Sequence, residues 1–423
     1  MKVILCTGGT HGDLYPFLDL GEALQMQGAE VLFILTPYDE EKGKSRGFNV
    51  VTSGPLLNVD EYIRDHPEIA TIGGGRKIWT DGYLPGVLPL YNKTIEMIGS
   101  FKPDVVVSHT FCIGSQWAAL DSKVKHVMMC LQPLGLFSVS EPLIMSLSDP
   151  AKFSDNAFLR WPISLLTRLK LSILYAYLNQ GLKKVTRQLG IPYQGHSFNN
   201  MYDRADRILG LWSKEFRNRS EGDPDNLRIC GFPFSPKDND SQLSPAIKQF
   251  LSIHSSPVVV ALGTSARNIA LEIYEKIAQA CENLGQPCIL IGCDEKSIET
   301  RYKNTIVTPF ESYNKLFPSA SLIIHHGGMG TCAEVFYSGH SNIVIPFMAD
   351  QFDNAFLANK LGVAPKALNR SGLSVQKLEG VISESLGNKE RQEKALQLSE
   401  VLKRSGNGAV VAADEIKKLM DNT

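Results

Sequence analysis

The segment HHGGMGTCAE, residues 325–334, combines residue types suited to binding an anionic ligand. It joins an apolar run to a stretch with helical periodicity, so a strand should turn here into a helix. The N–H groups at a helix start are unpaired and carry partial positive charge, which favours phosphate. Gly328 and Gly330 let the backbone approach closely, while Thr331 and His326 add side-chain donors. We expect a phosphate here and expect His325 to pack.

Other polar residues follow strands of the same half. Thr264 and Ser265 come after the run PVVVALG and suit a facing phosphate loop, so two such loops favour a diphosphate. Glu334 lies about one helical turn after Thr331, and a carboxylate offers two acceptor oxygens to a ribose diol. Asp350 and Gln351 follow the strand SNIVIPF and suit the hydroxyls of a sugar ring. The alternatives are a solvated Glu334 and a helix-capping Asp350.

Positioning these residues requires an α/β fold with two similar halves. KVILCT, a helical stretch and AEVLFILT predict a right-handed crossover between parallel strands. The pattern restarts after a linker rich in Pro, Ser and Asp at 231–245. We expect a Rossmann-like domain at 1–232, another at 233–405, and a helix at 406–423 that returns to the first. Two doubly wound domains of this kind bind ligands in the cleft at their strand ends.

The composition narrows the function further. With 43% apolar residues and a net charge of −1, the chain has no basic excess for nucleic acid. The eight cysteines are scattered without a Cys-x-x-Cys pair, which indicates reduced thiols and a cytoplasmic protein, and the N-terminus lacks the pattern of a signal peptide. The apolar stretch at 157–187 contains arginines, lysines and Pro162, which argue against a membrane span. It suits an amphipathic helix packed on its own domain, or one lying on an anionic membrane surface.

The segment LFPSASLIIHHGGMGTCAEVFYSGHSNIVIPFMADQFDNA, residues 316–355, resembles the UDP-glycosyltransferase superfamily of the GT-B fold, in particular bacterial antibiotic, rhamnolipid and sterol glycosyltransferases. GTHGDLYPFLDLGEAL near the N-terminus is similar to the acceptor-side motif of that family. The order of elements fits nearly the whole chain, whereas residues 60–230 carry little signal. The resemblance implies that the donor is held by the following residues: Gly12, Thr264, Ser265, His326, Gly328, Gly330, Thr331, Glu334, Asp350 and Gln351.

The resemblance also implies a general base near the first helix. Plant-type relatives carry a histidine three residues before the helix proline, while bacterial and sterol relatives often carry an aspartate. Counting back from Pro16 places Asp13 there, with His11 in reserve and helix capping as the alternative use of Asp13. His109 ends a later strand, where relatives place the aspartate that orients a histidine base. Asp13 and His109 would then form a pair in which the carboxylate and the imidazole have exchanged places relative to those relatives.

The reaction so implied is a single displacement by an acceptor hydroxyl, which inverts the anomeric configuration and needs neither a metal nor a cofactor. The donor would be a UDP- or TDP-linked hexose and the acceptor a small lipophilic or aromatic molecule. Trp79 and Tyr83, in a glycine-rich segment at 72–86 that we expect to be a loop, are candidates for the acceptor pocket. The sequence leaves monomer and homodimer open.

Three other classes share some of these features. The first glycine turn lacks the Gly-x-Gly-x-x-Gly spacing of a nicotinamide dehydrogenase. A sugar-nucleotide epimerase would share the two-domain fold but need no acceptor. An inactive sugar-nucleotide-binding partner protein should have lost the base or the sugar-binding pair, yet Asp13, Asp350 and Gln351 are present.

Overall fold

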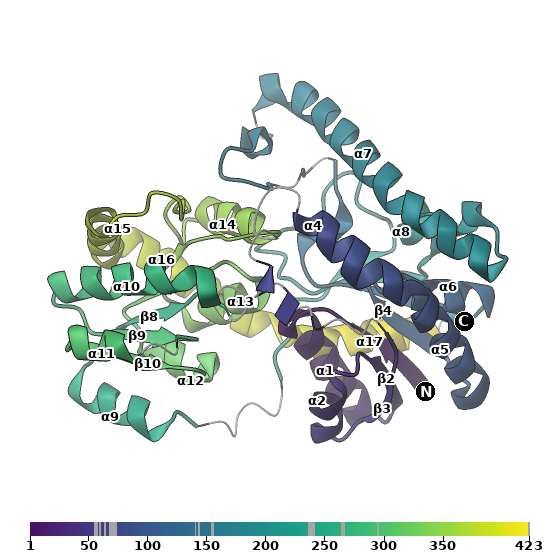
Figure 1. Ribbon diagram of the computed structural model, residues 1–423, viewed down its shortest axis with the longest axis horizontal. Helices are drawn as coiled ribbons and strands as arrows, with labels where there is room; N and C mark the ends of the chain where they lie inside the picture. Colours follow the sequence, from purple (N-terminus) through teal and green to yellow (C-terminus); the bar gives the residue numbers. More distant parts are fainter. Residues whose placement is uncertain are drawn as a thin grey trace.

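Two parallel β-sheets form the frame of the protein, one in each half of the chain (Figure 1). The computed structural model describes residues 1–54, 58, 61–62, 65–66, 74–139, 141–142, 144–153, 156–235, 242–263, 267–293 and 296–421. The two-sheet α/β architecture expected from the sequence is confirmed.

The N-terminal sheet has seven strands in the order β3-β2-β1-β4-β5-β6-β7. They are β1 (Lys2–Cys6), β2 (Glu30–Leu35), β3 (Asn49–Thr52), β4 (Val105–His109), β5 (Lys125–Cys130), β6 (Arg207–Gly210) and β7 (Leu227–Ile229). The helices of this half are α1 (His11–Met26), α2 (Glu40–Ser45), α4 (Gly74–Lys77), α5 (Leu84–Phe101), α6 (Ile113–Asp121), α7 (Ala157–Leu189) and α8 (Met201–Arg204). The sheet order reverses between β1 and β4, and this crevice is where folds of this class bind ligands.

The C-terminal sheet has five strands in the order β10-β9-β8-β11-β12. They are β8 (Val258–Ala261), β9 (Cys288–Ile291), β10 (Thr305–Thr308), β11 (Leu322–His325) and β12 (Asn342–Val344). The helices are α9 (Pro245–Ile253), α10 (Arg267–Asn283), α11 (Ser297–Arg301), α12 (Tyr313–Leu316), α13 (Met329–Ser338), α14 (Gln351–Lys360), α15 (Val375–Gly387), α16 (Lys389–Ser405) and α17 (Gly408–Asp421). Its order reverses between β8 and β11, so the second crevice lies at the ends of these two strands.

The strands are apolar because helices cover both faces of each sheet. Every residue of β4, β8, β9 and β11 is buried. All eight cysteines are free and buried. Among the helices that the structure describes, none is both long and apolar enough to cross a bilayer.

The chain crosses back from the second half to the first through α17. Ala412 and Ile416 are fully buried in the core of the N-terminal sheet, and Asp414 accepts a 2.7 Å hydrogen bond from Gln27 at the end of α1. The crossing point is tight, because a Cβ on Gly408 would lie 2.2 Å from the carbonyl oxygen of Gly231. The yellow helix α17 lies beside α1 in Figure 1.

The segment expected as a loop at 72–86 is helical over its described part. Residues 74–77 form α4, Ile78–Tyr83 form a π-helical turn, and α5 follows directly. The expectation of a loop was wrong because Gly74, Gly75, Gly82 and Gly86 were read as loop formers. Gly82 and Gly86 are instead buried at the closely packed helix.

Gly408→Ala tests the close approach at the crossing point. The added methyl group must displace backbone, so the free energy of unfolding should fall by about 1–3 kcal/mol in urea titrations. Gly380→Ala is the matched control, since no atom lies within 4 Å of the place its methyl group would take in α15 and helix propensity should raise stability by about 0.5–1 kcal/mol. Equal effects of both changes would contradict the tight crossing.

Candidate active site

The turn after β1 positions Asp13 at the third residue of α1. Thr10 is the helix N-cap, and Oδ2 of Asp13 accepts hydrogen bonds from the Thr10 amide at 2.7 Å and its hydroxyl at 3.0 Å. The two residues thus form a capping box. The alternative of Asp13 as the N-cap itself is wrong, because the helix begins two residues earlier. Gly12 and His11 occupy the exposed first turn, and Gly12 is itself exposed.

The other carboxylate oxygen of Asp13 faces His109, which ends β4. Nε2 of His109 lies 3.6 Å from Oδ1 of Asp13, while Nδ1 accepts from the Phe111 amide at 3.4 Å. The proton of the neutral ring therefore sits on Nε2, toward the carboxylate. Burial lowers the pKa of His109, and the charge of Asp13 opposes this shift. A neutral imidazole thus orients the carboxylate without neutralising it.

His11 points to a different partner. Its Nε2 lies 2.7 Å from Nζ of Lys42, which also pairs with Asp39 at 2.9 Å. An ammonium group only donates, so Nε2 of His11 accepts this hydrogen bond. The lone pair that a base needs is therefore engaged, and the geometry favours Asp13 over His11 as base.

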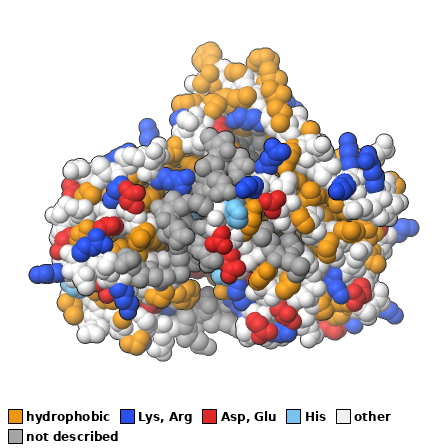
Figure 2. Space-filling view, in the orientation of Figure 1, with side chains coloured by type: hydrophobic (Ala, Val, Ile, Leu, Met, Phe, Trp, Pro, Cys, Tyr) orange, Lys and Arg blue, Asp and Glu red, His pale blue; other side chains and the backbone are white. Residues whose placement is uncertain are grey.

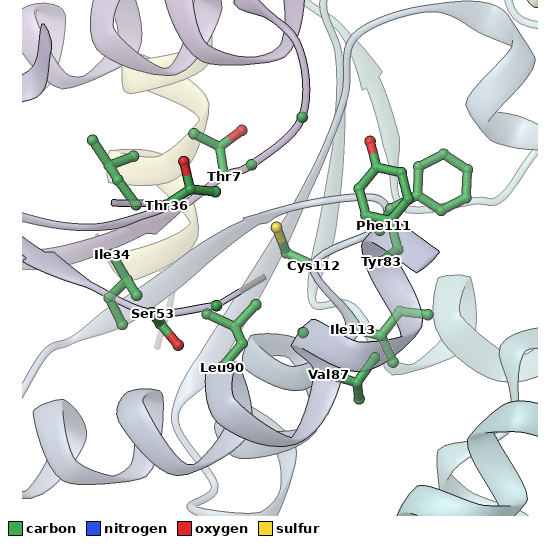
Figure 3. Close-up of a pocket in the computed structure, with 16 residues that line it drawn as sticks. Thr7, Ile34, Thr36, Ser53, Tyr83, Val87, Leu90, Phe111, Cys112 and Ile113 are labelled. Carbon is green, nitrogen blue, oxygen red and sulfur yellow. The ribbon is translucent and has the colours of Figure 1, made fainter. Parts of the chain in front are cut away.

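An apolar cavity opens beside Asp13 in the N-terminal domain (Figure 3). It encloses about 500 Å³, including space open to solvent. Gly9 separates it from Asp13, since a Cβ there would lie 2.3 Å from Oδ2 of Asp13 and 3.0 Å from the Tyr83 hydroxyl. Its lining includes Thr7, Gly9, Ile34, Tyr83, Val87 and Phe111.

Of the two aromatic residues proposed for acceptor contact, Tyr83 lines the cavity and Trp79 does not. Tyr83 lines the cavity, and burial, with the charge of Asp13 second, raises its pKa well above the usual value, so it stays a phenol. Trp79 is only 4% exposed and packs edge-on against Phe198, away from the cavity lining. Trp79 is therefore a core residue here. Phe111, which no motif indicated, lies beside Tyr83 with ring centroids 5.1 Å apart.

The glycine turn after β11 leads directly into the start of α13. Gly327 has φ of 90°, and a Cβ there would lie 2.9 Å from Val344 Cγ1, so only glycine fits. Gly328 is the N-cap and has no side chain to cap the helix, which leaves the first-turn N–H groups to a ligand or water. Gly330 is exposed with open space around it, so packing does not require glycine there. Thr331 is 8% exposed.

His326 lies over this turn and faces the end of β8. Its Nδ1 is 3.3 Å from the carbonyl oxygen of Ala261, and a Cβ on Gly328 would lie 2.4 Å from its Nε2. Because Nδ1–H donates to Ala261, Nε2 becomes a donor to phosphate only when the ring is protonated. Burial lowers the pKa of His326. The facing candidates Thr264 and Ser265 lie outside the described residues.

His325 has the packing role expected of it. It is fully buried, its Nε2 bonds to Asn342 Oδ1 at 3.1 Å, and its Nδ1 accepts from the Gly327 amide at 3.2 Å. Burial lowers its pKa to about 3, so the ring is neutral and supports the turn from below.

Glu334 lies on α13 near two tyrosines. Burial raises the pKa of Tyr313 to about 12, with the charge of Glu334 as second cause, and Glu334 acts on Tyr337 in the same direction. Tyr313 stacks on Phe317 with centroids 4.6 Å apart. The carboxylate thus borders an aromatic platform one helical turn from the glycine turn.

Asp350 is the N-cap residue of α14 and Gln351 its first residue, in the segment that follows β12. The Gln351 side-chain oxygen accepts from the amides of Phe347 at 2.8 Å and Met348 at 3.1 Å, which leaves its NH₂ group to donate elsewhere. Burial raises the pKa of Asp350 to about 6, and the charge of Asp13 contributes to the shift. The carboxylates of the two domains therefore lie within electrostatic range of each other.

Asn354 connects Asp350 to the glycine turn after β11, and the sequence motifs did not single it out. Its Nδ2 donates to the Gly327 carbonyl and to Asp350 Oδ2, both at 2.8 Å, and the residue is fully buried. The available signal was its spacing of four from Asp350, which places both on one helix face. Asn354 thus holds the turn and the carboxylate in one geometry.

Asp353, one residue before Asn354, forms a hydrogen bond between the two halves of the chain. Oδ1 of Asp353 accepts from the Ile144 amide of the N-terminal half at 3.2 Å, and burial raises its pKa to about 7. Among the described residues no group of three or more His, Cys, Asp or Glu side chains is arranged to hold a metal ion.

The C-terminal half of the chain is similar in sequence to known transferases. A family model described as UDP-glucoronosyl and UDP-glucosyl transferase matches residues 235–405. The uncharacterized UDP-glucosyltransferase YojK of Bacillus subtilis (strain 168) is 30% identical over 188 residues, 44% of this chain and 42% of that protein. The sterol 3-beta-glucosyltransferase UGT80A2 of Arabidopsis thaliana is 20% identical, covering 92% of this chain and 61% of its own. The matches thus span less than two thirds of these relatives.

Two solved structures share the whole fold. The calicheamicin glycosyltransferase CalG4 has a TM-score of 0.74 at 17% identity, covering 100% of this chain and 98% of its own. The glycosyltransferase VinC, solved in complex with DTDP, has a TM-score of 0.70 at 16% identity, covering 100% of both chains. The GT-B fold expected from the sequence is confirmed.

Asn354→Ala should destabilise the protein more than Asn359→Ala on the same helix, which removes one partly buried hydrogen bond to the Ala364 carbonyl. The first change leaves the Gly327 carbonyl and Asp350 without this donor, at a cost of about 2–4 kcal/mol in urea titrations. The loss should be larger at pH 7.5 than at pH 5, because Asp350 is ionised above its pKa of about 6 and then needs the donor most. A loss independent of pH would contradict the link to Asp350.

Proposed function

We propose that this chain, whose residues 235–405 match the family model of UDP-glucoronosyl and UDP-glucosyl transferases, transfers a sugar from a nucleoside diphosphate sugar to a hydroxyl group of a small lipophilic acceptor, with inversion. The observation that carries the proposal is the meeting of two half-sites at one cleft. Asp13 lies at the carboxyl end of the first sheet, and its charge acts on Asp350 at the carboxyl end of the second.

The donor occupies the second half-site in this proposal. The diphosphate binds at the N-terminus of α13 beside His326, Glu334 accepts from the ribose hydroxyls, and Asp350 and Gln351 hold the transferred sugar. VinC was solved with DTDP, which supports a uridine or thymidine diphosphate as the leaving group.

The acceptor occupies the cavity beside Asp13. Its apolar lining supports an aromatic or lipophilic molecule whose hydroxyl reaches past Gly9 toward the carboxylate. Asp13 takes the hydroxyl proton as the oxygen forms a bond to the anomeric carbon and the bond from that carbon to the diphosphate oxygen breaks. His109 orients Asp13, and the leaving diphosphate gains negative charge at the helix N-terminus and His326.

One assay distinguishes a transferase from an epimerase and from an inactive sugar-nucleotide-binding protein. Release of nucleoside diphosphate from UDP- and TDP-sugars is measured with and without a panel of phenolic, polyketide, sterol and hydroxy-fatty acceptors. A transferase releases the diphosphate in step with a glycosylated product only when an acceptor is present. Acceptor-independent conversion of the donor would indicate an epimerase, and binding without turnover an inactive partner protein.

Asp13→Asn should lower kcat by at least about 100-fold, because loss of a positioned general base typically costs 10²–10⁴-fold. The affinity for the nucleoside diphosphate, measured by calorimetry, should stay unchanged, since Asp13 lies in the other half-site. His11→Ala is the control, and we expect its kcat to change less than about threefold because Lys42 occupies the ring nitrogen. A large loss in His11→Ala with none in Asp13→Asn would assign the base to His11.

Binding of the diphosphate should take up a proton at His326. In the free protein burial lowers its pKa, so the ring is neutral at pH 7.5, whereas a bound diphosphate raises the pKa by charge attraction. Affinity for UDP or TDP should therefore rise as the pH falls from 8.5 to 7, a range in which the nucleotide itself changes little. Calorimetry in buffers of different ionisation enthalpy counts the proton. His326→Gln should bind more weakly and without this uptake, and equal uptake in both proteins would rule His326 out.

A further inference from the structure

The N-terminal half of α7 exposes a continuous apolar stripe. Figure 2 shows hydrophobic side chains gathered at the top of the molecule, where Figure 1 places α7. The stripe consists of Phe158, Trp161, Leu165, Leu169 and Ile173, which are 92%, 74%, 55%, 58% and 63% exposed. Soluble surfaces carry single apolar residues, but a contiguous set of this size indicates a binding surface.

The stripe lies on the side of α7 away from the protein. Its members follow one another at spacings of three and four, so they share one face of the helix. Ile163 and Thr167 are buried, and at about 100° per residue they fall on the opposite face. One apolar face therefore packs on the domain while the other has no counterpart among the described residues.

The charge of α7 distinguishes it from the rest of the chain. Residues 157–189 contain six Lys and Arg residues and no Asp or Glu, whereas the whole chain has a net charge of −1. Arg168 and Lys170 flank the stripe on either side, and Lys170 is also paired with the buried Asp149 at 3.4 Å. An apolar stripe with cations beside it is complementary to a surface with an apolar interior and anionic groups above it.

A second copy of the chain fits the stripe less well. In a twofold contact the same patch lies on both partners, so α7 would meet α7 and the cations of both copies would face each other. An anionic lipid surface suits both the apolar stripe and the cations beside it. Trp161 and Phe158 enter the boundary between headgroups and acyl chains, while Arg168 remains at the phosphates.

We propose that the exposed stripe of α7, with its flanking cations, docks the protein on the surface of an anionic lipid bilayer. The helix lies in the plane of the interface along about 22 Å, the length of 15 residues at 1.5 Å each. Docking does not depend on the proposed sugar transfer, because none of the stripe residues lines the cavity beside Asp13 or the glycine turn.

The test is sedimentation of the full chain with vesicles, without any nucleotide. Vesicles of phosphatidylcholine with 30% phosphatidylglycerol should pellet the protein, and pure phosphatidylcholine vesicles should pellet at least about tenfold less. Phe158→Ser/Trp161→Ser should weaken binding by about tenfold or more, and Arg168→Gln, which removes one flanking cation, by about fivefold. Ile253→Ser, which removes a 70% exposed apolar residue of α9, is the matched control and should bind like the wild type.

Circular dichroism and thermal unfolding establish that each variant is folded, which is expected because the changed side chains are exposed. Equal binding to neutral and anionic vesicles, or full binding by the Phe158/Trp161 variant, would overturn the proposal. So would a dimer seen by analytical ultracentrifugation without lipid that this variant converts to a monomer, since the stripe would then be a contact between copies. Sugar transfer measured on soluble acceptors should be unchanged in these variants, so failure of docking and failure of the proposed function remain distinguishable.

Discussion

In both sheets all strands are parallel, and the central strands β4, β8 and β11 are buried along their whole length, so polar chemistry can occur only where these strands end. β1 and β4 are neighbours at the reversal point of the first sheet, and β8 and β11 at that of the second. The ends of these strands and the segments that follow them carry Asp13, His109, Gly263 and His326. Contacts between the two halves hold the sheets relative to each other, through the aromatic contact of Phe216 with Phe336 and the packing of α17 in the core of the N-terminal sheet.

At the ends of these strands, burial shifts the pKa of the polar side chains and so increases the effect of each polar contact. Asp350 is desolvated and lies in the field of Asp13, which raises its pKa to about 6, and the amide of Asn354 offsets part of that shift. The same amide group holds the Gly327 carbonyl, so the glycine turn and the Asp350 carboxylate are coupled through one side chain. In the other domain His109 is kept neutral by burial and presents its proton to Asp13. Each half-site is therefore pre-oriented before any ligand binds.

Much of this arrangement was predictable because it depends on local patterns. Apolar runs ending in glycine turns marked β1, β8 and β11, and the helix expected at 406–423 is present as α17. Two errors came from the same source, which is that glycine content alone does not distinguish a loop from a close helix contact. The segment 74–86 is helical, and Trp79 went into the core because its ring packs on Phe198, 119 residues later in the chain. Asn354 was missed because its partners, Gly327 and Asp350, belong to two different turns.

The sequence by itself determined the α/β fold class, the strand-to-helix turns and the residue types at each turn, because these follow from periodicity and from the conformational freedom of glycine. Only the tertiary structure decided which turns meet. It turned His11 toward Lys42, placed His109 beside Asp13, put Tyr83 rather than Trp79 at the cavity, and left one face of α7 exposed. The physical reason is that these outcomes depend on contacts between residues far apart in the chain, and on burial, which no local pattern reports.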